Sequence, residues 1–112
     1  SDEQDLDSMQ RVWGGLVDQV AFVKYNPWEN VYNKPANGLE KACSDLWRRM
    51  FVWWDGKINP CDVDFKSHLC VGNASSQDLG SLWQSEKYMV LRESHIAKKR
   101  SNCEPCNRCT LV

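Results

Sequence analysis

Four cysteines in this chain have a spacing that can bring their thiols to one centre. Cys43 and Cys61 lie on either side of Gly56, and Cys103 and Cys106 form a Cys-x-x-Cys pair near the C-terminus. Thiolates delivered from separate chain segments are the ligands that soft metals prefer. This set of four cysteines, the cysteine frame, therefore predicts a four-thiolate metal site. Its spacing alone favours neither zinc nor an iron–sulfur cluster.

A tight turn between the first two cysteines would bring them together. The dipeptide Asp55-Gly56 lies between an apolar run at 49–54 and the segment 57–61. Asp-Gly between two such runs is the strongest short-range signal for a β-hairpin. A hairpin folds the chain back on itself, so the cysteines on its two sides can approach each other.

The N-terminal segment predicts a helix and then a strand. Leu6, Met9, Trp13 and Leu16 recur at helical spacing. Residues 17–25 are apolar on both faces in their middle, as in a strand that is covered on both sides. Residues 26–42 are rich in asparagine, proline and glycine, so we expect an irregular linker.

The segments after the hairpin predict mainly helices. A short strand or bulged extension is expected within 63–71, and Gly72-Asn73 is expected to break it. Residues 75–78 and Ser85 are candidate N-caps for two helical segments. The chain is therefore expected to have an α+β fold, with a central β-hairpin and following helices in one small domain.

The residues around the cysteines resemble the C-terminal auxiliary-cluster module of radical S-adenosylmethionine (SAM) enzymes, called SPASM or, in its one-cluster form, Twitch. The resemblance implies three parts: a terminal helix and strand of the partial (β/α) catalytic barrel at 1–25, a linker at 26–42 and the cluster domain at 43–112. The matching stretches are Cys43–Trp47, Val52–Gly56, Pro60–Asp64, Val71–Asn73, Ser81–Trp83, Leu91–Arg92 and Cys103–Cys106.

The resemblance implies one [4Fe-4S] cluster bound by Cys43, Cys61, Cys103 and Cys106. Cys109 is a possible alternate to either member of the terminal pair. A full two-cluster module ends in a longer run of cysteines than this chain has, so a single cluster is expected. In recombinant protein, zinc can fill such a site in place of iron.

The resemblance also limits what the chain can do alone. Radical SAM chemistry requires a Cys-x3-Cys-x2-Cys motif, and the sequence contains none. We therefore expect no catalytic residues and no activity in the isolated chain, with SAM bound only by the parent enzyme, an oxidoreductase. The implied partners are the catalytic barrel of the same parent chain and a peptide or small-molecule substrate. Trp28, Glu29 and Tyr32 are candidate substrate contacts, although packing of the linker is the favoured interpretation.

Charge and hydropathy exclude some classes of partner. Fourteen basic and fifteen acidic residues leave a net charge of −1, so neither nucleic acid nor an anionic membrane is expected as a partner. No apolar run reaches the roughly 20 residues of a membrane helix. A cytoplasmic location is expected. Two other interpretations of the six cysteines stay open: a non-catalytic zinc-binding interaction module and a disulfide-stapled secreted domain.

Several other polar residues have simpler expected roles. Cys70 lies outside the frame and is expected to be structural. His95 is expected to be packed or at the surface. Asp62 and Asp64 are expected to bond backbone amides beside a ligand, and Arg92 to make an ion pair or a helix-cap contact.

Overall fold

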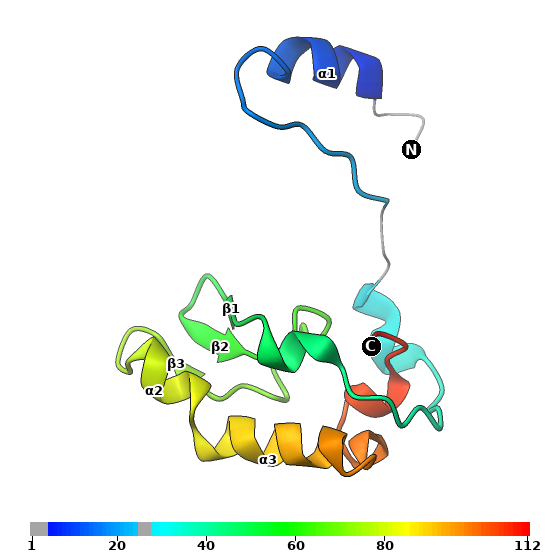
Figure 1. Cartoon of the computed structure of the whole chain (residues 1–112), viewed down its shortest axis with the longest axis vertical. Helices are drawn as coiled ribbons and strands as arrows, with labels where there is room; N and C mark the ends of the chain where they lie inside the picture. Colours follow the sequence, from blue (N-terminus) through cyan, green and yellow to red (C-terminus); the bar gives the residue numbers. More distant parts are fainter. Residues whose placement is uncertain (1–4, 25–27) are drawn as a thin grey trace.

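The computed structural model describes residues 5–24 and 28–112 and has a small α+β fold (Figure 1). A three-stranded antiparallel sheet in the order β1-β2-β3 packs beside two consecutive helices. The helices are α1 (Leu6–Trp13), α2 (Leu79–Trp83) and α3 (Glu86–Ile96), and the strands are β1 (Phe51–Val52), β2 (Lys57–Asn59) and β3 (Gly72–Asn73). Short 3₁₀ helices span Trp28–Asn33, Ser44–Trp47, Arg100–Asn102 and Cys106–Arg108.

The predicted hairpin is confirmed. β1 and β2 pair with Phe51 opposite Asn59 and Val52 opposite Ile58. Gly56 has a φ of 87°, and a Cβ there would lie 2.5 Å from the side-chain oxygen of Asn73. Glycine therefore suits this turn both in backbone conformation and in the space available.

The third strand lies just beyond the segment in which it was expected. Gly72-Asn73, predicted to break a strand, itself forms β3 and pairs with Lys57 and Ile58 of β2. A Cβ on Gly72 would overlap the side chains of Leu82 and Gln77. The missing side chain lets α2 approach the strand closely, so a residue that weakens strands locally is favoured here by packing.

The larger apolar cluster joins the sheet to α2 and α3. Ile58, Val71, Leu82 and Tyr88 are buried together, and Met50, Ala74 and Trp83 pack against them. The predicted N-caps are confirmed at Asp78 and Ser85, whose side chains accept backbone N–H groups of Ser81 and Tyr88. The two caps fix where α2 and α3 begin, so that Leu82 and Tyr88 lie in the larger apolar cluster.

Arg92 makes the helix-cap contact that was one of its two expected roles. Its guanidinium donates to the carbonyl of Trp83, at the end of α2, and to that of Leu46. It also lies 4.3 Å from the ring centroid of Trp83 and 4.4 Å from that of Tyr88. The buried charge is thus placed among carbonyls and aromatic rings.

The N-terminal segment is only partly as predicted. α1 forms, with Asp5 as N-cap, and none of its residues is buried. The strand prediction for 17–25 is wrong over 17–24, which contain no strand, and Tyr25 lies outside the described residues. Val17 and Val23 are 47% and 90% exposed. Apolar residues alone do not make a strand, because its backbone groups need a neighbouring strand to pair with.

The linker packs on the domain through its 3₁₀ helix. Val31 is 1% exposed and contacts Val63 and Cys109. The ring of Tyr32 packs edge-on against Phe65. For Trp28 and Glu29, the other candidate substrate contacts, the structure describes the backbone alone. Within 5–24 and 28–112, no helix combines the length and apolar character that crossing a bilayer demands.

Candidate metal centre

Four cysteines from three separate segments line one buried cavity. They are Cys43, Cys61, Cys106 and Cys109, and the cavity volume is about 20 Å³, close to the space that a single water needs. His95 and Arg100 are the polar members of the remaining wall, and its apolar members are Leu46, Pro60, Val63, Leu69, Pro105 and Leu111. Three of the predicted ligands and the predicted alternate therefore meet at one place.

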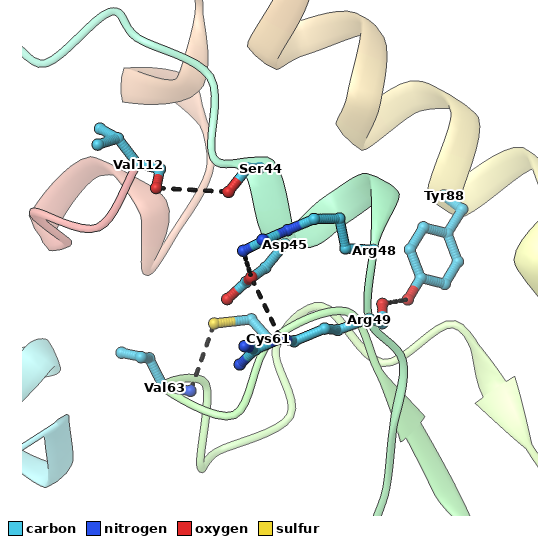
Figure 2. A network of polar contacts seen from close by, with 8 residues as sticks. All are labelled: Ser44, Asp45, Arg48, Arg49, Cys61, Val63, Tyr88 and Val112. Carbon is cyan, nitrogen blue, oxygen red and sulfur yellow. Dashed lines mark hydrogen bonds and ion pairs between the residues drawn. The ribbon is translucent and has the colours of Figure 1, made fainter. Parts of the chain in front are cut away.

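The first two cysteines are positioned by turns that adjoin the hairpin. Cys43 is the N-cap of the 3₁₀ helix Ser44–Trp47, which leads into β1. Cys61 follows Pro60 directly after β2, and its Sγ accepts the backbone N–H of Val63 at 3.3 Å (Figure 2). The predicted hairpin thus brings these two cysteines to one cavity.

The C-terminal pair is held by a tail that folds back over the domain. Cys106 begins the last 3₁₀ helix, and Cys109 follows its end, with Sγ accepting the backbone N–H of Leu111 at 3.4 Å. The hydroxyl of Ser44 donates to the carbonyl of Val112 at 3.5 Å, next to Cys43 (Figure 2). The tail therefore lies beside the segment before β1 that carries Cys43.

Arg100 anchors this tail from inside. It is 1% exposed, and its guanidinium donates to the carbonyls of Cys106 and Cys109 at 3.4 and 3.2 Å. It also donates to the carbonyls of Lys41 and Leu111 at 2.7 and 2.9 Å. These acceptors are neutral, and the guanidinium Nε is buried without a hydrogen-bond partner among the described residues. A buried positive charge therefore forms part of the cavity wall.

His95 lies beside it on α3 and is 1% exposed, as expected for a packed histidine. Its Nδ1 accepts the backbone N–H of Cys43 at 3.1 Å. Its Nε2 is buried and has no partner within the described part of the chain. Burial, and secondly the charge of Arg100, lower the pKa of His95 to about 4. The imidazole is therefore neutral near pH 7.

The thiols of Cys43, Cys61 and Cys106 are protonated near pH 7 in the metal-free protein. Burial raises the pKa of both Cys61 and Cys106 to about 12, and it also raises the pKa of Cys43. The charge of Arg100 acts in the opposite direction on Cys43 and Cys106. Because metals bind thiolates, occupation of this site must displace protons.

Cys103 and Cys70 lie at a different cavity. They line an open groove of about 550 Å³ along α3, together with His68, Lys87 and Leu91 among others. The Sγ of Cys70 donates to the carbonyl of Gly72 at 3.3 Å, in keeping with its expected structural role. Among residues 5–24 and 28–112, no three histidine, cysteine or acidic side chains are already grouped closely enough for a single metal ion.

Asp64 bonds backbone amides in the loop after Cys61, as predicted. It is fully buried and accepts the backbone N–H groups of His68 and Leu69 at 3.0 and 2.8 Å. The hydroxyl of Tyr32 also donates to it. The carboxylate thus fixes the loop after Cys61 and joins the linker to it.

Comparison with known proteins identifies this region. The family model of the SPASM domain, described as an iron–sulfur cluster-binding domain, matches residues 43–110. An uncharacterized protein of Treponema pallidum (strain Nichols) is 31% identical over 113 aligned residues, which cover 94% of this chain and 30% of that protein. The chain thus spans less than a third of this relative. No solved structure matches. Because the match covers all six cysteines and more than half of its length, the chain belongs to the SPASM family of iron–sulfur cluster-binding domains.

Proposed function

We propose that the chain binds one [4Fe-4S] cluster through Cys43, Cys61, Cys106 and Cys109. The observation that carries this proposal is their convergence on one buried cavity inside the matched region. Four thiolates complete the outer coordination of such a cluster. Cys103 was predicted as a ligand in the place now given to Cys109, and its position at the α3 groove favours the exchange.

The cavity wall suits a negatively charged group. A cluster bound by four thiolates is anionic, and Arg100 supplies a buried positive charge whose hydrogen bonds go to neutral carbonyls. Buried charges are costly unless a counter-charge or hydrogen bonds compensate them. Two buried nitrogens of the wall, His95 Nε2 and Arg100 Nε, also have no acceptor among the described residues. An anion beside them would compensate the charge of Arg100 and could accept hydrogen bonds from both nitrogens.

The cavity must widen to admit this group, because its present volume is close to that of one water. Apart from His95 on α3, its walls are 3₁₀ helices, the loop after β2 and the C-terminal tail, whereas the larger apolar cluster joins the sheet to α2 and α3. Segments outside that cluster can separate without breaking it. Widening is therefore compatible with keeping the sheet and α3 in place.

We assign the cluster to electron transfer, or to organising a substrate pocket, in a parent radical SAM enzyme. When bound, a cluster with all four irons ligated supplies one-electron transfer and offers no free iron to substrate. Residues 1–25 would belong to the catalytic barrel, which would cover the exposed apolar residues of α1. The substrate would be a peptide or another small molecule, and the location cytoplasmic.

Anaerobic reconstitution with iron and sulfide tests the proposal. We expect about four irons per chain and an electron paramagnetic resonance (EPR) signal after reduction. Cys109→Ser should abolish stable assembly, whereas Cys103→Ser and Cys70→Ser should leave the iron content unchanged. Stoichiometric zinc that iron cannot replace would favour the zinc-binding interaction module instead.

A further inference from the structure

The tautomer of His95 follows from its contact with Cys43. A backbone amide can only donate, so the nitrogen that accepts from Cys43, Nδ1, carries no hydrogen. A neutral imidazole then carries its single hydrogen on Nε2. This N–H group is buried without an acceptor among the described residues. The contact with Cys43 therefore makes Nε2 a fixed donor.

The surroundings of His95 limit what can accept this hydrogen. The ring forms part of the cavity wall, whose other side chains are the four cysteines, Arg100 and apolar residues. Arg100 is itself only a donor. The acceptors that these side chains offer are therefore sulfur atoms. Buried N–H groups are rarely left unpaired in native proteins, so this donor indicates an acceptor inside the cavity.

We propose that His95 is a positioning residue whose Nε2–H donates a hydrogen bond to a sulfur of the bound cluster and so raises its reduction potential. This inference rests on the cluster-binding function proposed above. Reduction adds negative charge that is shared by the sulfur atoms, which makes them better acceptors. A fixed donor therefore stabilises the reduced state more than the oxidised state, and hydrogen bonds to sulfur are known to set cluster potentials.

Two substitutions separate the two nitrogens of the ring. In His95→Asn the side-chain oxygen can replace Nδ1 as acceptor for Cys43, while the donor at the Nε2 position is lost. In His95→Gln the longer amide can place an N–H near the Nε2 position, while the Nδ1 acceptor is lost. His68 lines the open groove along α3, away from the cysteine cavity, so His68→Asn controls for general effects of losing an imidazole.

The potential of the reconstituted 112-residue chain is measured by EPR-monitored redox titration, with iron content measured in parallel. We expect His95→Asn to keep its iron and to lower the potential by about 59 mV, a tenfold change in the one-electron equilibrium. His95→Gln and His68→Asn should stay close to the unsubstituted protein. An unchanged potential in His95→Asn, or equal falls in both His95 variants, would overturn the role of Nε2.

A second measurement needs no substitution. Pulsed EPR on the reduced protein, grown with ¹⁵N-labelled histidine, should show coupling between the cluster and one histidine nitrogen. Absence of this coupling would overturn the inference while leaving cluster binding intact. Failure of the unsubstituted protein to assemble any cluster would instead refute the proposed function.

Discussion

Acid should destabilise the metal-free protein through His95. The folded-state pKa of His95 is about 4, whereas its ordinary value is 6.5. Because the folded pKa is the lower one, the neutral ring contributes its full stability above pH 6.5. That contribution is lost as the pH falls through 4. The gap between the two pKa values corresponds to roughly 3 kcal/mol of unfolding free energy, which is a large share of the stability of a small domain.

Urea unfolding at a series of pH values measures this contribution, with tryptophan fluorescence as the signal. Carboxylates also titrate in this range, so the useful quantity is the difference between the unsubstituted protein and His95→Asn. We expect that difference to change by roughly 3 kcal/mol between pH 7 and pH 4, with the variant showing the flatter dependence. His68→Asn should follow the unsubstituted protein. If the His95→Asn curve runs parallel to the unsubstituted one, burial does not hold the ring of His95 neutral.

Three further outcomes test the fold and the thiols. At pH 9, Cys61 and Cys106 of the native protein should react with iodoacetamide on the order of 100-fold more slowly than in urea, because a pKa of about 12 leaves little thiolate. Equal reaction rates, measured by mass spectrometry, would contradict the burial of these two thiols. Ile58→Ala should lower the free energy of unfolding by about 2–5 kcal/mol because Ile58 is fully buried in the larger apolar cluster, whereas Val52→Ala, at a half-exposed position, should cost far less in the same urea titration. Gly56→Ala should lower the free energy of unfolding by about 1–2 kcal/mol because of the positive φ at this position, and the close approach of Asn73 should lower it further. If the thermal midpoint of Gly56→Ala is no lower than that of Gly15→Ala, the turn does not require glycine.

Local sequence signals predicted the elements that depend on neighbouring residues. The hairpin follows from Asp55-Gly56, and the starts of α2 and α3 follow from the side chains of Asp78 and Ser85. β3 was misplaced because glycine weakens strands locally, while the packing of Leu82 against Gly72 is a tertiary effect. The strand at 17–25 was predicted from its apolar faces, and periodicity carries no information on whether a pairing partner is present.

In the candidate site, too, features set by neighbouring residues were predictable and features set by tertiary packing were not. The cysteine frame identified where thiols would gather, but Cys103, Cys106 and Cys109 have equal spacings and similar surroundings in the sequence. No local pattern distinguishes which two of them face Cys43 and Cys61. No sequence pattern indicates that His95 and Arg100 form part of the cavity wall. Their contacts with Cys43 and Lys41 span 52 and 59 residues, which is beyond the reach of any periodicity or capping rule.

The way Arg100 is bonded has a consequence for metal uptake. Its guanidinium holds the carbonyls of Cys106 and Cys109 rather than their sulfur atoms. The backbone of the tail is therefore fixed near the cavity while both thiols stay available as ligands. Conformational entropy lost in ordering the tail is offset by these hydrogen bonds before any metal arrives. Metal binding at such a site must displace protons and widen the cavity, but it need not order the tail. Structural zinc in small zinc fingers differs, because there the metal orders an otherwise unfolded chain.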